Sequence, residues 1–344
     1  MRAVVNRNAD RAAVPGANHD ARAFHEALDG YAPTPLHDLP AIAAELGLAA
    51  VGCKDESDRL GLPAFKVLGA SWAVERALAL DPGVHTLVAA SAGNHGRAVA
   101  HVARRRGLQA RVLLPARSAP ARREAIAAEG AKVVVVEGGY EEAVVRAAAE
   151  GAEPGFFELA DVGAAGPAEW VIDGYATLFA EVGSEGAWDL VVVPAGVGSL
   201  AAAAARFGAE VGAAVIAAEP ASAACVAASL AAGSPQVIAT PGTTMAGLDC
   251  AEVSEAAWPS LQAGLAGAIA VTDEEAHGAM RELAAAGMRI GDCGAAALAA
   301  LRALAADPAA AELRAAVRIS PETRAVLIAT EGITDPDGYA AATS

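Results

Sequence analysis

The sequence predicts an α/β protein made of open, mostly parallel sheets with helices on both faces. Apolar runs rich in β-branched residues recur along the chain, and turn residues end each of them. An alanine-rich segment of helical length follows most runs, which is the rhythm of β-α-β units. The runs lack polar alternation, as expected of strands covered on both faces. The expected strands are 86–91, 110–115, 132–138, 189–196, 214–220 and 325–332.

Composition indicates a well-packed globular protein. The chain has 344 residues, of which 54% are hydrophobic and 19% charged, so it is long enough for two domains or one large α/β unit. Its net charge of −16 opposes binding to nucleic acid or anionic lipid. We therefore expect neither partner.

Cysteine usage and the N-terminal sequence favour the cytoplasm. The N-terminus shows no continuous apolar segment of a secretory signal, and glycine and proline interrupt the uncharged stretch 190–205, so we expect no membrane segment. The cysteines form no CxxC pair, which predicts reduced thiols and no metal site. They are Cys53, Cys225, Cys250 and Cys293.

One helix start is clear from the sequence. Thr272 and Glu275 have the spacing of a capping box, acidic residues fill the first turn, and Gly287 marks the end. These features predict a helix without indicating any chemistry.

Lys66 lies in an apolar stretch, ESDRLGLPAFKVLGASWA, that otherwise has the character of a protein interior. A buried ammonium costs several kcal/mol unless it is paired or loses its proton. One interpretation is a lysine whose methylenes cover apolar surface while its amine reaches water. The other is a functional amine.

A glycine-rich turn between a strand and a helix predicts an anion site at 196–200. Gly196 and Gly198 allow close backbone approach, and amides near Ser199 would face an anion at the helix N-terminus. An ordinary tight turn is one alternative. Another is a dinucleotide-binding fold, because the segment also fits GxGxxA and Glu219 ends the next strand.

A second loop, SAGNHG, ends the strand at 86–91 and starts a helix at once. Small polar side chains and backbone amides gather there, a setting suited to a carboxylate. For Ser91 and Asn94 the alternative is helix capping, and for His95 it is a packed core histidine.

An amine able to form an imine, a phosphate loop and a carboxylate loop together describe pyridoxal 5′-phosphate with an amino acid substrate. Six motifs resemble the diaminopropionate ammonia-lyase group of fold-type II pyridoxal phosphate enzymes, relatives of threonine and serine dehydratases. They run in consistent order from about residue 31 to residue 339. The motifs are KDESDRLGLPAFKVLGAS, SAGNHGRAVA, AGVGSL, WVIDGYATLFAEV, TTMAGLDC and TEGITDPDGY.

The resemblance implies roles for the cofactor-binding residues. Lys66 would form the imine with the cofactor, its burial would help to keep the amine neutral, and Phe65 would lie beside the cofactor ring. Asn94 would contact the phenolic oxygen. Ser91, Asn94 and His95 would receive the substrate. The expected phosphate cradle is Gly196, Val197, Gly198, Ser199 and Leu200.

Two further assignments carry alternatives. Thr330 falls where this fold type offers a hydroxyl to the pyridine nitrogen, and the alternative is a hydrogen-bonding residue at a strand end. Asp161 falls where the ammonia-lyases carry an active-site aspartate that acts as acid or base, and the alternative is a helix or turn cap.

Ala92 departs from the group. The ammonia-lyases have an aspartate immediately before the GNHG glycine, associated with handling one substrate enantiomer, whereas SAGNHG resembles the dehydratase form. The GDCG at 291–294 likewise alters a GESG-like loop. These changes leave the substrate and its stereochemistry open.

The resemblance implies a two-domain enzyme with its active site in the interdomain cleft. We predict a large domain of residues 1–66 and 183–344 and a smaller one of 67–182. The expected activity is α,β-elimination from a small amino acid, giving a 2-keto acid and ammonia. A serine or threonine dehydratase, a racemase, a β-replacement enzyme and an inactive binding paralogue stay open. A homodimer is expected from the family.

Overall fold

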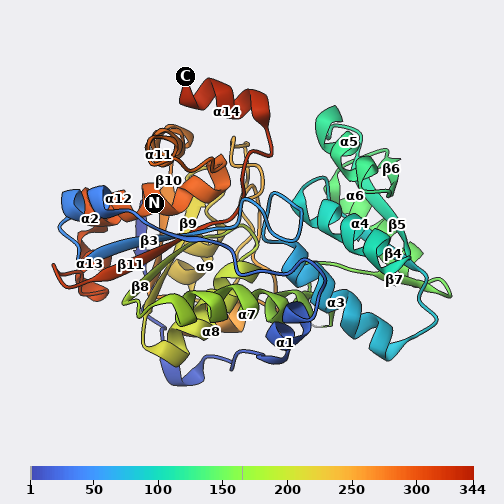
Figure 1. Ribbon diagram of the computed structural model, residues 1–344, viewed down its shortest axis with the longest axis horizontal. Helices are drawn as coiled ribbons and strands as arrows, with labels where there is room; N and C mark the ends of the chain where they lie inside the picture. The colour runs from blue at the N-terminus through green and yellow to red at the C-terminus, as the bar shows by residue number, and fades with distance from the viewer. Residues whose placement is uncertain (1, 165) are drawn as a thin grey trace.

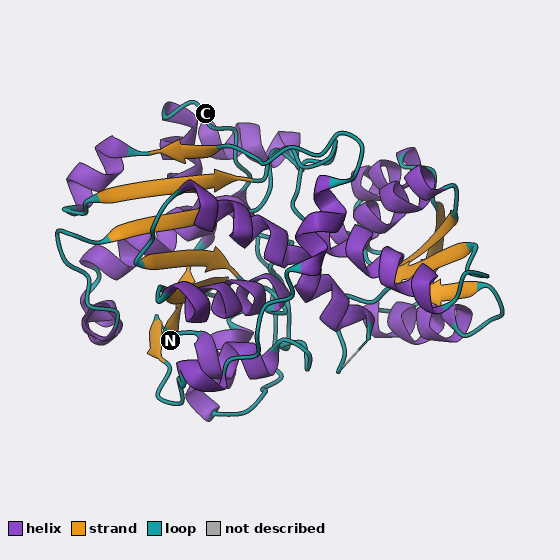
Figure 2. Ribbon diagram, turned by 60° about the horizontal axis from the view of Figure 1, so that its bottom comes forward, coloured by secondary structure: helices purple, strands orange, loops and turns teal. Residues whose placement is uncertain are grey.

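The computed structural model describes residues 2–164 and 166–344, and it contains two separate sheets flanked by helices (Figures 1 and 2). The larger sheet has the strand order β1-β10-β9-β8-β11-β3-β2, and the smaller has the order β6-β5-β4-β7. The strand bounds are β1 Ala3–Val5, β2 Leu36–Asp38, β3 Ala50–Asp55, β4 Thr86–Ala90, β5 Gln109–Pro115, β6 Lys132–Val136, β7 Phe156–Glu158, β8 Leu190–Pro194, β9 Ala214–Pro220, β10 Gly267–Val271 and β11 Arg324–Ala329.

Both sheets are mostly parallel, as predicted. All pairings in the smaller sheet are parallel, and in the larger sheet only the edge strands β1 and β2 run antiparallel to their neighbours. Parallel neighbours place the carboxyl ends of the inner strands along one edge, where ligands of such folds bind. The fold therefore brings the ends of β8 and β11 close together.

Helices cover both faces of the larger sheet. Val191 and Val193 of β8 join one apolar core, whereas Leu190 and Val192 join the core on the opposite face. The alternation explains why this strand has no polar face. The helices are α1 Asp20–Glu26, α2 Pro40–Leu46, α3 Val67–Leu80, α4 Asn94–Arg106, α5 Pro120–Ala128, α6 Tyr140–Gly151, α7 Pro167–Glu185, α8 Ser199–Val211, α9 Cys225–Ala232, α10 Trp258–Gly264, α11 Asp273–Ala285, α12 Asp292–Ala306, α13 Ala311–Ala316 and α14 Pro336–Thr343.

The six predicted strands are confirmed as β4, β5, β6, β8, β9 and β11. The predicted capping box at the start of α11 is also confirmed, with Thr272 Oγ1 accepting from the amide of Glu275 at 3.2 Å. The sequence analysis did not predict β3 and β10 or the three-residue strands β1, β2 and β7. The domain boundaries at 66/67 and 182/183 stay a prediction.

Helices α3 and α7 pack closely beside each other between the two sheets (Figure 1). Two glycines allow this contact. A Cβ on Gly174 would lie 2.6 Å from the carbonyl oxygen of Leu68, and one on Gly69 would lie 2.7 Å from the ring of Tyr175. Because Lys66 directly precedes α3, this packing fixes the position from which its side chain extends.

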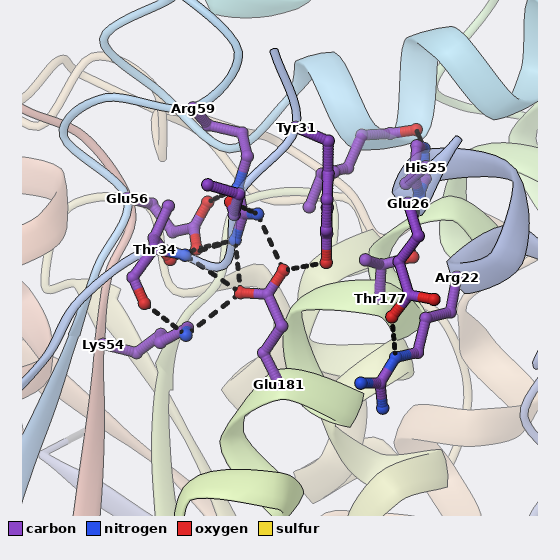
Figure 3. A network of polar contacts seen from close by, with 12 residues as sticks. Arg22, His25, Glu26, Tyr31, Thr34, Lys54, Glu56, Arg59, Thr177 and Glu181 are labelled. Atoms are coloured by element: carbon purple, nitrogen blue, oxygen red, sulfur yellow. Dashed lines mark hydrogen bonds and ion pairs between the residues drawn. The ribbon is translucent and has the colours of Figure 1, made fainter. Parts of the chain in front are cut away.

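A buried network of charges precedes Lys66 in the chain (Figure 3). Arg59 donates to the carboxylates of Glu56 and Glu181 over 2.6 to 2.8 Å, and Lys54 lies 3.0 Å from Glu181. These four side chains are at most 1% exposed. Glu56 and Arg59 follow β3 and Glu181 lies on α7, so the network ties the loop before Lys66 to that helix.

Among residues 2–164 and 166–344, no single helix has the length and apolar character needed to cross a membrane. One pair of segments, 292–306 and 308–316, meets these criteria only jointly and across an 87° bend. The four cysteines are free thiols.

Candidate active site

Lys66 is held beside the end of β11 by backbone contacts. The amide of Phe65 donates to the carbonyl of Thr330 at 3.2 Å, and Ala64 forms an isolated β-bridge with Glu331. The loop before α3 therefore runs along the carboxyl edge of the larger sheet. This arrangement brings Lys66, Phe65 and Thr330 to one place, as the sequence predicted.

The amine of Lys66 forms an ion pair with Asp161. Lys66 Nζ lies 3.0 Å from Asp161 Oδ2, and the two side chains are only 20% and 14% exposed. Burial alone would lower the pKa of Lys66, but the nearby Tyr175 and the Asp161 carboxylate outweigh it and raise that pKa. The expectation of a neutral buried amine is therefore wrong for the cofactor-free protein, because Asp161 stabilises the ammonium.

Asp161 is also close to His95. His95 Nε2 lies 2.8 Å from the carbonyl oxygen of Leu159, so in the neutral ring this nitrogen carries the proton and donates it. Burial lowers the pKa of His95 and favours that neutral form. The other nitrogen, Nδ1, faces Asp161 Oδ2 at 3.7 Å and has no hydrogen-bond partner.

The Lys66 ammonium keeps Asp161 ionised. Burial opposes this ionisation, yet the positive charge of Lys66 and its hydrogen bond hold the pKa of Asp161 below its usual value. Its carboxylate is thus an anion aimed at the amine, and the helix-capping alternative does not describe it. The positions of Lys66, His95 and Asp161 fit the predicted constellation, and their roles stay predictions.

The SAGNHG loop leads directly into α4, which begins at Asn94. Ser91 Oγ accepts from the amide of Gly93 at 3.3 Å, which is a local turn contact. Asn94 does not cap the helix: its Nδ2 donates to Glu331 Oε2 at 2.5 Å. The side chain of Asn94 is therefore directed away from its own helix.

The glycine-rich turn forms the N-terminus of α8, a helix of 13 residues. Gly198 has φ +95°, a conformation that favours glycine, and a Cβ there would lie 2.6 Å from Leu261. A Cβ on Gly196 would lie 2.8 Å from the sulfur of Cys250. Close packing therefore requires glycine at both positions, and the backbone amides of the turn lie at a helix N-terminus, a setting that suits a phosphate.

The remaining cradle residues connect the turn to its surroundings. The carbonyl of Val197 accepts from the amide of Ser254 at 2.8 Å. Ser199 Oγ donates to the carbonyl of Asp161 at 3.3 Å, which links the turn to the aspartate. Leu200 is packed in the core and contributes only its backbone to the turn.

Two buried hydroxyl groups near Lys66 have no hydrogen-bond partner among residues 2–164 and 166–344. Thr330 Oγ1 stands at the end of β11, and Tyr175 OH belongs to a ring packed 4.8 Å from that of Phe65. An unsatisfied buried hydroxyl costs about 1–3 kcal/mol, so native proteins seldom leave one without a reason. Thr330 Oγ1 therefore has free bonding capacity, and its contact with a pyridine nitrogen stays a prediction.

Sequence reasoning missed several residues of this region. Glu331 follows Thr330 directly. Its position in TEG, at the end of a predicted strand, could have identified it as a candidate site residue. A cleft between the two sheets has a lining that includes Ala92, Asn94, Arg122, Asp292, Cys293 and Glu331.

The dinucleotide alternative required Glu219 to face a ribose. Instead, its two carboxylate oxygens accept from the amides of Val226 and Ala227 at 2.7 and 2.8 Å. The side chain is fully buried at the start of α9, and burial raises its pKa to about 8. It is therefore engaged in the fold and does not face the glycine turn as a free carboxylate.

The fold and the site together define a class of protein. A lysine amine, a glycine turn at a helix N-terminus and an unpartnered hydroxyl at a strand end fit pyridoxal 5′-phosphate. The chain belongs to the family described as pyridoxal-phosphate dependent enzymes, whose family model matches residues 27–331. Its mixed α/β architecture is that of the fold-type II members.

Two relatives and one solved structure are similar to this chain over differing shares of its length. A diaminopropionate ammonia-lyase of Salmonella typhimurium is 32% identical and aligns over 93% of this chain and 90% of its own length. The crystal structure of the Escherichia coli diaminopropionate ammonia-lyase with an aminoacrylate-PLP azomethine reaction intermediate superposes with a TM-score of 0.90, at 28% identity, covering 99% and 96% of the chains. The Escherichia coli threonine dehydratase IlvA is 28% identical over 73% of this chain and 48% of its own length.

Proposed function

We propose that this protein is a lyase that removes the β-substituent of a small amino acid, 2,3-diaminopropionate or a close analogue, to give a 2-keto acid and ammonia. Near full-length similarity to diaminopropionate ammonia-lyases supports this activity, whereas the threonine dehydratases align over a smaller part of the chain. The observation that carries the proposal is the buried Lys66–Asp161 pair at 3.0 Å, which a hydrogen bond from Ser199 links to the glycine turn at the N-terminus of α8. Bound pyridoxal phosphate supplies an electron sink for this reaction.

Lys66 has two tasks in this proposal. Its amine would hold the cofactor covalently and, when free, would take the proton from the substrate Cα. Asn94 would contact the cofactor's phenolic oxygen, Thr330 the pyridine nitrogen, and Phe65 the ring face. The backbone amides of the turn from Gly196 to Leu200 would hold the phosphate.

Asp161 acts in proton transfer near the leaving group. Its ionised carboxylate first stabilises the Lys66 ammonium and then, once the amine is engaged, becomes free to accept or return a proton. His95 is neutral and presents an unprotonated Nδ1 to the same carboxylate, so it is placed to share that proton. Ser91 and its neighbours receive the substrate carboxylate.

Ala92 supports a second candidate, a serine or threonine dehydratase. Its methyl group lines the cleft where the ammonia-lyase pattern has a carboxylate, so this position cannot move a proton. The expected consequence is a narrow preference for one enantiomer. Racemisation and β-replacement use the same parts and differ in what surrounds the reacting carbon.

We also propose that the enzyme works as a homodimer in the cytoplasm and consists of a large domain, 1–66 with 183–344, and a small one, 67–182. The free thiols suit a reducing compartment. The dimer follows from the family resemblance. Sedimentation of the purified protein and limited proteolysis at the two boundaries test these statements.

Borohydride reduction tests the central assignment. The chain has three lysines, which makes the mapping simple: Lys66, Lys54 and Lys132. We expect the purified protein to be yellow and the reduced cofactor to be found on the Lys66 peptide alone.

Lys66→Ala should lose at least about 10³-fold in turnover. The matched control, Lys132→Ala on an exposed site, should leave colour and turnover unchanged. Label on Lys54 or Lys132 would refute the assignment.

A substrate panel separates the two candidate activities. L- and D-diaminopropionate, serine and threonine are supplied, and keto acid and ammonia are both measured. Two ammonia molecules per keto acid identify the ammonia-lyase, because both amino groups leave. One ammonia from serine or threonine, with no turnover of diaminopropionate, identifies the dehydratase.

A further inference from the structure

Glu331 joins the two sides of the cleft. It follows β11 on the side of the larger sheet, whereas Asn94 begins α4 on the side of the smaller sheet (Figure 1). Asn94 Nδ2 donates to Glu331 Oε2 at 2.5 Å, and the two residues are 237 positions apart. Because the acceptor is a carboxylate, this hydrogen bond is charge-assisted when Glu331 is ionised.

The backbone of Glu331 is fixed from two directions. Its β-bridge to Ala64 connects it to the loop that carries Lys66, and its carbonyl accepts from the amide of Gly291 at 3.1 Å. A Cβ on Gly291 would lie 3.3 Å from Glu331 Oε1, so α12 begins directly against the carboxylate. The acceptor for Asn94 therefore occupies a fixed place.

The charged and titratable groups facing Glu331 come from several elements. Asp292 and Cys293 of α12 gather with it so that their side-chain ligand atoms lie within 4.8 Å of one another. Arg122 of α5 acts on it from across the cleft, while Arg97 of α4 is paired with Glu129. Burial and Asp292 raise the pKa of Glu331 to about 6, against opposing contacts from Cys293, Asn94 and Arg122.

We propose that Glu331 is a positioning residue whose carboxylate fixes the amide of Asn94 across the cleft and so controls how tightly the cofactor is held. The inference rests on the proposed cofactor role of Asn94. An amide has two N–H donors, so one held by Glu331 leaves the second available for the cofactor's phenolic oxygen. The ionised carboxylate is the better anchor, because charge-assisted hydrogen bonds are about twice as strong as neutral ones.

The ionised state of Glu331 is unfavourable for the fold itself. A carboxyl whose pKa is raised in the folded protein destabilises that state when it is ionised, and the effect is fully present above the folded value near 6. It disappears as the pH falls from about 6 towards the unfolded value of 4.5. A residue with a purely structural role would not be expected to keep such a charge, since glutamine offers the same hydrogen-bond acceptor.

Glu331→Gln separates a positioning role from a purely structural one, because it should raise stability and weaken cofactor binding. At pH 8, the cofactor-free variant should melt at a higher temperature than the parent, and this difference should vanish below about pH 5. Its affinity for pyridoxal phosphate, measured by fluorescence titration, should be about fivefold weaker at pH 8. The parent should approach the variant's affinity as the pH falls through 6. Asp337→Asn, which removes an exposed charge in the first turn of α14, is the control and should change neither quantity.

The cofactor's phosphate also titrates near pH 6, so the measured quantity is the difference between the two proteins at each pH. A variant with unchanged affinity, or one that melts at a lower temperature at pH 8, would overturn the role of Glu331. If the parent itself binds no cofactor on Lys66, the proposed function fails instead, and the melting comparison of the cofactor-free proteins still reports on the charge of Glu331.

Discussion

The charge network around Arg59 and the polar cluster around Lys66 differ in how completely their buried hydrogen-bonding groups are satisfied. In the network around Arg59, the buried nitrogen and oxygen atoms of Lys54, Glu56, Arg59 and Glu181 have partners (Figure 3). Around Lys66, three buried atoms have none: His95 Nδ1, Tyr175 OH and Thr330 Oγ1.

The difference indicates which cluster binds a ligand. Both clusters contain a buried lysine paired with a carboxylate, so buried charge by itself does not identify a functional site. A fully satisfied network holds the fold together, because each ion is compensated by protein groups. Unused hydrogen-bonding capacity at Thr330 and Tyr175 points instead to a partner that the protein does not supply.

Breaking the Arg59 network should give the largest loss of stability. Arg59→Met leaves the carboxylates of Glu56 and Glu181 buried without their main cation, which costs about 3–5 kcal/mol at pH 7. Turnover per folded molecule should change little. Chemical denaturation and activity below the melting transition measure the two effects.

The same variant has a defined pH dependence. Arg59, Lys54 and Tyr31 lower the pKa of Glu181, so the stability it contributes is present above the unfolded value of 4.5 and is lost at lower pH. The difference between parent and Arg59→Met should therefore shrink on acidification below 4.5. A loss of turnover at intact stability would instead place Arg59 in the active site.

Replacing the carboxylate beside Lys66 should reduce turnover, whereas Arg59→Met should mainly reduce stability. Asp161→Asn removes the group that stabilises the Lys66 ammonium, so the pKa of Lys66 should fall and its amine should react faster with a simple aldehyde at pH 8. Turnover should nevertheless drop about 10²-fold, because the proton-transfer group is gone. Reductive labelling of the cofactor-free protein and steady-state kinetics measure the two quantities.

Glu185→Gln is the matched control for Asp161→Asn. Glu185 also accepts from a buried lysine, Lys54, at 2.5 Å, but it belongs to the Arg59 network. It should leave both the labelling of Lys66 and the turnover unchanged. Equal effects of the two substitutions would mean that Asp161 has only a structural role.

Local sequence patterns predicted the features that depend on neighbouring residues, namely strands and strand-end loops. The apolar runs gave six strands, and glycines at strand ends marked both loops of the site. Strand β3 was missed because Lys54 interrupts its apolar pattern, and the carboxylates that pair with this lysine, Glu181 and Glu185, lie far along the chain. Strand β10, GAIAV, was missed because glycine and alanine have low strand propensity.

Long-range pairings could not be predicted in the same way. Lys66 and Asp161 are 95 residues apart, and only the family resemblance suggested that Asp161 belonged to the site. The hydrogen bond between Asn94 and Glu331 depends on how α4 faces the end of β11, which no local pattern specifies. The protonated state of Lys66 follows from the same tertiary contact, so burial alone gave the wrong direction for its pKa.

The smallest effect tests the unsatisfied hydroxyl directly. Thr330→Val keeps the shape of the side chain and removes Oγ1, so the cofactor-free protein should gain about 1 kcal/mol of stability, while cofactor affinity falls about fivefold. Thr330→Ser retains a hydroxyl and should keep most of the affinity. A Val variant that is less stable without cofactor and binds it normally would show that Thr330 Oγ1 serves the fold, and the contrast between the two clusters would no longer distinguish the ligand site from the structural network.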